Sequence, residues 1–542
     1  MLIRNGFAVF CLFIFFAGCQ SDTFQNKIVK SQGQTRSYDI RDFGAKGDGE
    51  SLDTAAIQAA IDACGRNGGG VVVVPAGRYV TGTIKLKSKV TLEVAEGGEI
   101  LGSKDLADYA TDIQDSIEAP KFSKCLIYAE NAEDITICGQ GVIDGRGLMK
   151  DFPVKLDGEL QERPMLMRFV ECRDIKFEDI TLKDAASWCV HLVSCEKIRV
   201  DNVKIDSMVN HNNDGFDLDG CEDIVIENSH IVSGDDSICP KSTTGRLTKN
   251  MLVKNCRVSS NTAAFKCGTS SAGGFKDIVV TDCVFYDCRM GCIKLLMVDG
   301  GVLEDIEISN IKMENVEGPL FIRLGNRGRV YNKPTEQVYE KDVRSEGAAV
   351  GKVRNVKIYN IQATVKGSDK ARQGMMISGV PGYMVEDVLL EDIEISFSGG
   401  GTAEDARLVV AEDEARYPEQ FFFGVLPSYG LYLRHAKGIT LDNVRFELQS
   451  EEKRPAIVCD DVENIEITGF EADGSKADSL IRIIQGRKIF IRESSSRNKM
   501  PIFVKVEGDR SSDINLVGND LGQAEKMVVS GSDVNPDTVT VE

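Results

Sequence analysis

Three aspartates lie within one short stretch of the chain, and acidic side chains that are brought together can carry out acid–base chemistry. Asp214 precedes a glycine, and the pair Asp235 and Asp236 follows one. Carboxylates held ~4.8 Å apart repel each other by about 1–4 kcal/mol, depending on the effective dielectric constant. That repulsion can keep one carboxyl group protonated while its neighbours stay ionised. Hydrolysis of a glycosidic bond needs this division, because one acid protonates the leaving oxygen and one base activates water.

Two other interpretations of these aspartates stay open at this point. Ca²⁺ accepts several carboxylate oxygens, and aspartates also cluster in surface turns that have no chemical role. The 16 cysteines include no CxxC pair, so a zinc site is not expected. We predict catalysis by Asp214, Asp235 and Asp236, without a metal ion or another cofactor.

The position of these side chains depends on a repeat in the middle of the chain. The segments FVECRDIKFEDITLKD, LVSCEKIRVDNVKIDS and LDGCEDIVIENSHIVS alternate apolar and polar residues with period two. Cys172, Cys195 and Cys221 mark the repeat at intervals of 23 and 26 residues. Repeats of this length with short strands are typical of a parallel β-helix. Propeller blades are longer, at about 40–45 residues.

Stacked turns of such a fold would bring the three aspartates together. Residues one turn apart in a parallel coil lie above one another at the strand spacing of ~4.8 Å. Asp214 and Asp236 are 22 residues apart, which matches one turn. We therefore expect Asp214 to lie against the pair formed by Asp235 and Asp236.

Three cations follow on later turns of the repeat, namely Lys266, Lys294 and Arg323. Each one taken alone has the simpler interpretation of a solvated surface charge. Their shared position in the repeat predicts a row of cations on the face that carries the aspartates. Such a row would bind the carboxylates of an acidic substrate.

Charge and cysteine usage limit the class of protein. The formal net charge of −20 argues against general binding to nucleic acid or anionic membranes. It does not exclude an acidic sugar, because a local basic patch can lie in an acidic surface. Most cysteines lie singly in apolar runs, so we predict that they are buried and free.

The sequence predicts one all-β domain, a single β-helix over residues 38–542. Residues 51–69 have a Ser/Asp start, apolar residues at helical spacing and a glycine-rich end, so they predict a helix that caps the N-terminal end of the coil. Two stretches, near 326–347 and 399–428, interrupt the repeat. Long insertions in a solenoid are loops on one face, often the binding face.

The N-terminus has the pattern of a targeting segment. A positive start, an apolar run and the small residues before Cys19 predict a signal peptide over 1–19, and 20–37 is predicted to be a flexible linker. The stretch FFAGC resembles a bacterial lipoprotein signal, which would place a lipid on Cys19. We expect an exported cell-envelope lipoprotein, periplasmic or surface-exposed and anchored to the outer membrane or cell surface. An ordinary cleaved signal peptide is the alternative.

Two groups of motifs resemble a known family. The opening YDIRDFGAKGDGESLDTAAIQAAIDAC is similar to pectin-degrading β-helix proteins in general, and RPMLMRFVECRDIKFEDITLKDAASWCVHLVSC to the polygalacturonase group. From about residue 38 to about 325, the chain resembles the polygalacturonase family, glycoside hydrolase family 28. The family's Asn-Thr-Asp motif is Asn212-Asn213-Asp214 here, and its Gly-Asp-Asp motif is present as Gly234-Asp235-Asp236.

The resemblance implies a right-handed parallel β-helix and a pectic polysaccharide or oligosaccharide as substrate. It implies that Asp235 is the general acid, while Asp214 and Asp236 activate water and the anomeric carbon is inverted. The spacing of the aspartates alone leaves inversion and retention open.

Two family motifs differ in this chain. The Gly-His-Gly motif falls near residues 262–264, which are Thr-Ala-Ala, and His211 is the candidate for a replacement imidazole that binds substrate. The Arg-Ile-Lys motif is Cys292-Ile293-Lys294. Our alignment places Lys266 in the column of Cys292, so Lys266 is a candidate for a relocated cation. These differences argue against ordinary endo-cleavage of homogalacturonan and favour an exo-acting enzyme whose insertions close a pocket.

Three rival functions stay open from the sequence. A β-helix polysaccharide lyase would use a cation and an Arg or Lys base, and the row of lysines fits it. A non-catalytic β-helix that binds glycans is permitted by the missing His and Arg. The third rival keeps the hydrolase but changes the sugar, for example to a galactoside or a side chain of a complex pectin.

Overall fold

The computed structural model describes residues 36–118, 122–329, 349–367, 369–474 and 476–542. The chain from Arg36 to Glu542 groups into one compact unit. The predicted signal segment with Cys19, nearly all of the predicted linker and most of the insertion at 326–347 lie outside the described residues. Among the described residues, no helix has the length and hydropathy of a membrane span.

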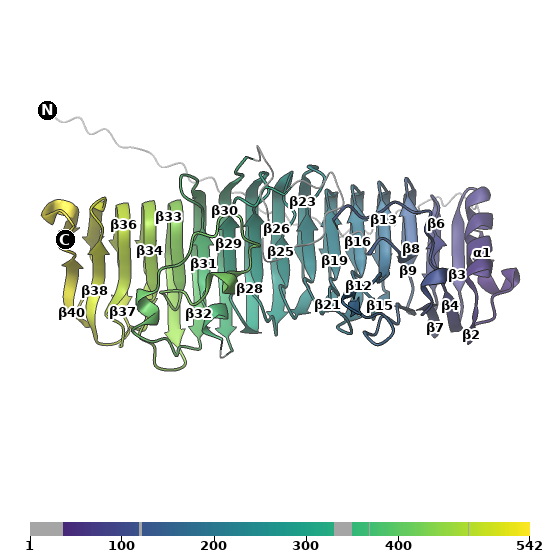
Figure 1. The fold of residues 1–542 in the computed structure, drawn as a ribbon, viewed down its shortest axis with the longest axis horizontal. Coiled ribbons are helices and arrows are strands. Elements are labelled where there is room, and N and C mark those ends of the chain that lie inside the picture. The colour runs from purple at the N-terminus through teal and green to yellow at the C-terminus, as the bar shows by residue number, and fades with distance from the viewer. Residues whose placement is uncertain (1–35, 119–121, 330–348, 368, 475) are drawn as a thin grey trace, which may run out of the picture. The chain divides into compact units, whose positions relative to one another are not determined.

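Each turn of the chain adds strands to parallel ladders, which confirms the predicted parallel β-helix (Figure 1). The first ladder lies next to the turns that hold the aspartates. It consists of β5 (Ile84–Lys85), β8 (Cys125–Glu130), β13 (Met165–Val170), β16 (Val190–Val193), β19 (Phe216–Asp219), β22 (Ile238–Lys241), β25 (Phe265–Cys267), β27 (Ile293–Met297), β29 (Leu320–Leu324), β31 (Met375–Ser378) and β33 (Leu431–Leu448).

Two further ladders complete the early turns. The second consists of β3 (Gly70–Val74), β6 (Val90–Val94), β9 (Glu133–Cys138), β14 (Arg173–Glu178), β17 (Glu196–Asp201), β20 (Glu222–Glu227), β23 (Thr248–Lys254) and β26 (Gly274–Tyr286). The third consists of β4 (Gly77–Thr81), β7 (Gly98–Gly102), β10 (Val142–Asp144), β15 (Thr181–Lys183), β18 (Lys204–Ser207), β21 (His230–Ser233) and β24 (Arg257–Ser260). Later turns use longer strands, including β28 (Val302–Val316), β30 (Lys352–Val365), β32 (Val385–Phe397), β34 (Ile457–Thr468) and β36 (Ser479–Arg492).

The corners of the turns explain the sequence repeat. Two positions in each turn, five residues apart, adopt the left-handed backbone conformation, which Asn and Asp tolerate better than most side chains. One row of corners includes Asp223, Asn250 and Asp277, and the other includes Asn228, Asn255 and Asp282. Their side chains also bond from turn to turn, as Asn255 Nδ2 donates to Asn228 Oδ1 at 2.7 Å.

The predicted N-terminal helix is present as α1 (Thr54–Arg66). Its buried residues Ile57, Ala60, Ile61 and Cys64 recur at helical spacing and belong to the same core as the strands. In Figure 1, α1 lies at the start of the coil beside β3. The helix therefore covers the apolar end of the first turn, as predicted.

The predicted burial of the cysteines is confirmed within the described residues. Fourteen cysteines are described, all are free, and all except Cys138 are buried. Cys172, Cys195 and Cys221 lie in one column, because the strands that follow them pair in register. They pack as small apolar side chains in the core.

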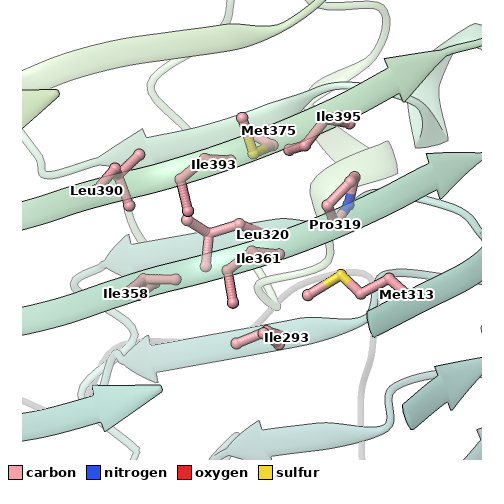
Figure 2. A pocket seen from close by; sticks show the side chains of 10 residues that line it. All are labelled: Ile293, Met313, Pro319, Leu320, Ile358, Ile361, Met375, Leu390, Ile393 and Ile395. Carbon is pink, nitrogen blue, oxygen red and sulfur yellow. The ribbon is translucent and has the colours of Figure 1, made fainter. Parts of the chain in front are cut away.

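A small cavity inside the coil is part of the core and has no polar lining. Its volume is about 20 Å³, and Ile293, Met313, Leu320 and Met375 are among the residues that surround it (Figure 2). Without a hydrogen-bonding side chain the cavity offers nothing to a sugar, so the functional site has to be sought outside the coil.

The predicted insertion at 399–428 is a loop of residues 398–430, between β32 and β33. Its side chains Val410, Phe423 and Leu426 form a buried cluster with outward-facing side chains of the first ladder. Those partners are Leu296, Phe321, Met376 and Tyr432, and Val458 of the adjacent strand β34 also belongs to the cluster. The loop thus covers the first ladder just beyond the turns that hold the aspartates.

Candidate active site

The turns that precede β19 and β22 lie above one another. The backbone N–H of Gly215 donates to the carbonyl oxygen of Asp236 at 2.9 Å, and Phe216 pairs with Ile238. One carboxylate oxygen of Asp214 and one of Asp236 lie within 4.8 Å of each other. The predicted stacking of Asp214 on Asp236 is therefore confirmed.

Glycine and a buried amide allow this close packing. A Cβ atom at Gly215 would lie 2.3 Å from the carbonyl oxygen of Ser237, so no side chain fits there. The buried Asn213 side chain donates to the carbonyl oxygens of Ala185 and Ser187, at 2.8 and 3.1 Å. These contacts tie the turn that carries the first aspartate to the preceding turn.

Asp235 is partly exposed, whereas the other two aspartates are buried. Its carboxylate accepts a hydrogen bond from Thr262 Oγ1 at 3.1 Å and one from Asn212 Nδ2 at 3.4 Å. Burial and then the negative charge of Asp236 raise the pKa of Asp235. This carboxyl group therefore holds its proton to a higher pH than an ordinary aspartate.

Asp236 has the opposite protonation behaviour. Its Oδ2 accepts from Lys266 Nζ at 2.7 Å, and its Oδ1 accepts from Thr262 Oγ1 at 2.8 Å. Burial alone would raise the pKa of Asp236, but the charges of Lys266 and Lys294 outweigh burial and lower that pKa to about 2. Asp236 is thus a carboxylate at any ordinary pH.

Asp214 belongs to a second buried acidic group, which it forms with Asp217 near Lys241. Burial, followed by the charges of Asp217 and Asp235, raises the pKa of Asp214 well above its usual value. Burial also raises the pKa of Asp217 to about 8, although Lys241 Nζ lies 3.5 Å from it. The same Lys241 Nζ lies 3.6 Å from Glu118. The Asp214 carboxyl group therefore holds its proton to a higher pH than an ordinary aspartate.

The structure places Lys266 and Lys294 beside the aspartates but corrects their alignment. Lys266 pairs in register with Lys294, and not with Cys292 as the sequence alignment predicted. The alignment was wrong by two positions, because the turn from β25 to β27 spans 28 residues and the alignment assumed 26. Lys266 therefore continues the column of Lys294 and does not replace the missing arginine.

Arg323 is not part of the carboxylate cluster. Its column contains Leu296, whereas Lys294 pairs with Phe321. The buried Arg323 guanidinium donates to Ser378 Oγ at 2.9 Å and to the carbonyl oxygen of Glu412 at 2.8 Å. Arg323 therefore fastens the 398–430 loop to the first ladder, so the structure does not place it for the predicted contact with substrate.

His211 lies beside the site without joining it. Its side chain is exposed, and its backbone N–H donates to Asn210 Oδ1 at 2.8 Å. Within the described residues, the imidazole forms no hydrogen bond with the three aspartates. A role for His211 would therefore require a direct contact between its imidazole and the substrate.

A polar cleft of about 90 Å³ lies on the N-terminal side of the aspartates. Its lining includes Arg168, His191, Asp219, Thr243 and Glu118. His191 is 2% exposed, and neither ring nitrogen has a hydrogen-bond partner among the described residues. Burial lowers the pKa of His191 well below its usual value, so the ring is neutral.

The calcium alternative finds little support in the donor atoms. Oxygens of Asp214 and Asp236 and the sulfur of Cys239 come within 4.8 Å of one another. The Cys239 thiol donates to the carbonyl oxygen of Gly268 at 3.0 Å, and burial raises its pKa well above the usual value. A protonated thiol is not a ligand for a hard cation, and Lys266 already supplies positive charge to Asp236.

Sequence reasoning missed five residues of the site, which are Thr262, Asp217, Lys241, Tyr417 and Glu419. Asp217 and Lys241 could have been found, because they occupy outward positions of β19 and β22, where the period-two alternation predicts exposed side chains. Thr262 belongs to the Thr-Ala-Ala stretch that lies near the family's Gly-His-Gly motif. No sequence pattern indicates that Tyr417 and Glu419 lie at the site, because their position depends on how the 398–430 loop packs against the coil.

Comparisons with known proteins agree with this geometry. The model of the glycosyl hydrolases family 28 matches residues 64–411. A probable polygalacturonase of Vitis vinifera is 30% identical over 322 residues, which cover 54% of this chain and 64% of that protein. An exo-poly-alpha-D-galacturonosidase of Dickeya chrysanthemi is 26% identical over 333 residues, which cover 51% of this chain and 55% of that protein.

Solved structures confirm the fold. An exopolygalacturonase from Thermotoga maritima has a TM-score of 0.61 and 23% identity, over 76% of this chain and 92% of that chain. This similarity supports the right-handed parallel β-helix that the family resemblance implies. The match to the Vitis vinifera and Dickeya chrysanthemi proteins spans less than two thirds of their lengths. The family match itself covers more than half of the 542 residues and includes all three aspartates, so the chain belongs to glycosyl hydrolases family 28.

Proposed function

We propose that this protein is a glycosidase that hydrolyses a glycosidic bond in a pectic, galacturonate-containing saccharide with inversion at the anomeric carbon. The observation that carries the proposal is that the pKa values of two adjacent aspartates are shifted in opposite directions. The pKa of Asp235 is raised and that of Asp236 is lowered, although the hydroxyl of Thr262 contacts both carboxyl groups. Glycoside hydrolysis requires one group that donates a proton to the leaving oxygen and one that activates water.

Each aspartate has a distinct proposed role. Asp235, which is partly exposed and has a raised pKa, donates its proton to the leaving oxygen. Asp236, which is ionised, accepts a proton from the attacking water. Asp214 lies next to Asp236 and has a raised pKa, so its proposed role is to orient that water by hydrogen bonding and not to accept its proton. The proposal thus narrows the sequence-based hypothesis, in which Asp214 and Asp236 shared the role of base.

Product analysis tests both the reaction and its stereochemistry. On defined pectic oligosaccharides, we expect hydrolysis from one chain end, because the 398–430 loop covers the first ladder beyond the aspartates. Proton NMR of the first turnovers should show the anomer opposite to that of the bond cleaved. Retention of configuration would remove the proposed division of roles, and a majority of mid-chain cuts would remove the exo-acting proposal.

A polysaccharide lyase is less well supported. Its base would have to lose a proton near neutral pH, yet Lys266 is held as a cation. Burial would lower the pKa of Lys266, but Asp236, Tyr417 and Glu419 outweigh burial and raise that pKa well above its usual value. A 4,5-unsaturated product that absorbs in the ultraviolet would favour the lyase instead.

We also propose export and lipid anchoring through Cys19, on the support of the FFAGC sequence alone. In a bacterial host fed a radiolabelled fatty acid, the full chain should carry the label and fractionate with the envelope. The Cys19→Ser variant should lose the label. Labelling that persists in this variant would contradict lipidation at Cys19.

A further inference from the structure

The two lysines next to the aspartates are already neutralised by carboxylates of the protein. Lys266 Nζ lies 2.7 Å from Asp236 Oδ2 and 3.7 Å from Glu419 Oε1. Lys294 forms an ion pair with the other oxygen of Glu419. The side chains of Lys266, Lys294 and Glu419 are only 4%, 0% and 10% exposed. Two cations and two anions therefore form a closed group that has no charge left for a ligand.

Glu419 reaches this position because its loop is fixed on both sides. Tyr417, two residues earlier, accepts a hydrogen bond from Thr269 Oγ1 at 3.0 Å. Phe423, shortly after it, packs against Phe321 in the cluster that holds the loop on the first ladder. The Glu419 carboxylate thus stands beside the lysines, where the carboxylate of an acidic sugar would have to bind.

Two other cations near the aspartates are held by contacts within the protein. Lys241 lies between Asp217 and Glu118. The Arg168 guanidinium donates to the backbone carbonyl oxygens of Gln114 and Asp115, and burial lowers its pKa. The cleft on this side also contains Asp219 and Glu171. A uronate placed here would meet more negative than positive charge.

We propose that Glu419 determines substrate specificity by neutralising Lys266 and Lys294, so that the sugar bound against Asp235 and Asp236 is neutral, a hexose or deoxyhexose rather than a uronate. This inference rests on the proposed glycosidase function and refines its substrate. Galacturonate units of the pectic saccharide would lie outside this sugar position. A uronate at this position would instead face the Glu419 carboxylate, and like charges brought together disfavour the wrong ligand.

The test compares the binding of two disaccharides that differ only in charge. The probes are digalacturonate and its carboxyl-reduced, neutral form, titrated calorimetrically into the full chain carrying Asp235→Asn, which prevents turnover. We expect the neutral disaccharide to bind at least about tenfold more tightly. Adding Glu419→Gln should lower this ratio at least about tenfold, because it leaves an uncompensated lysine charge that attracts the uronate.

A double substitution provides the matched control. Glu419→Gln with Lys294→Met removes one charge of each sign, so the preference for the neutral disaccharide should return. Thermal unfolding would show whether Glu419→Gln folds. If it does not, the affinity ratio of the two probes is still measured in the Asp235→Asn chain that keeps Glu419 and in the double variant, and both should prefer the neutral disaccharide. Equal or tighter binding of digalacturonate, binding of neither probe, or an unchanged ratio in a folded Glu419→Gln variant would overturn the inference. Failure of the wild-type chain to hydrolyse any pectic saccharide would instead remove the proposed function.

Discussion

Replacing Asp235 with asparagine is expected to lower kcat on a pectic oligosaccharide by about 10²–10⁴-fold, because an amide cannot protonate the leaving oxygen. Asparagine has nearly the same shape, and its side-chain oxygen can still accept from Thr262 Oγ1. The neighbouring Asp236 keeps its partner Lys266. Substrate binding should therefore survive, with KM changed little. Steady-state release of reducing ends measures kcat, and calorimetry measures binding.

The matched control for this prediction is Asp277→Asn. Asp277 is exposed and occupies a left-handed corner with φ of 54°, a conformation that Asn250 adopts one turn earlier. The same chemical change at this corner should leave kcat and the unfolding temperature as they are. Full activity of Asp235→Asn, or an equal loss in Asp277→Asn, would show that Asp235 is not the general acid.

The pH profile provides a second check on the same assignment. Because the pKa of Asp235 is raised, activity should fall as the pH rises through that value and the acid loses its proton. The pKa of Asp236 is about 2, so Asp236 does not limit activity until strongly acidic pH. The residual activity of Asp235→Asn should therefore lose the alkaline limb of the profile while keeping the acidic one.

Much of the fold could be predicted from the sequence because one rule repeats along it. Period-two alternation gives the strands, and Asn or Asp at two fixed positions gives the corners, as at Asp223 and Asn228. Stacking then follows from the length of one turn, so Asp214 and Asp236 were placed correctly without coordinates. In a solenoid, each turn contacts only its neighbours, and local spacing is therefore enough.

The rest of the site could not be predicted, because it depends on distances along the chain that the repeat does not fix. Two additional residues in the turn between β25 and β27 place Lys266 in register with Lys294 and not with Cys292, as the alignment assumed. Glu419 lies more than a hundred residues from Lys294, yet the two form an ion pair. The periodic pattern does not predict where a loop of this length packs against the coil. The two lysines were thus predicted beside the aspartates, but not the carboxylate that neutralises them.

Replacing Lys266 with methionine is expected to lower the free energy of unfolding by about 3–5 kcal/mol, because it leaves the buried Asp236 carboxylate without its closest counter-ion. The two groups are 2.7 Å apart, with side chains 4% and 5% exposed. The pKa of Asp236 should rise, so activity should also be lost at the acidic end of the profile. Chemical denaturation and the pH dependence of kcat measure the two effects. In contrast, Lys276→Met breaks a solvent-accessible pair with Glu304, which keeps its second partner Arg354, and should leave the unfolding midpoint unchanged.

The sign of the pH effect distinguishes loss of this ion pair from loss of packing. A carboxyl group whose pKa is lowered on folding contributes stability that is present above its unfolded pKa of about 3.9. That contribution is lost as the pH falls toward the folded pKa of about 2. Wild-type stability should therefore decline between these values, and Lys266→Met should decline less. The double variant Lys266→Met with Asp236→Asn, which buries no unpaired charge, should recover part of the stability but none of the activity. If the double variant is no more stable than Lys266→Met, Lys266 stabilises the fold by packing and not by its charge. The lowered pKa of Asp236 would then need another explanation.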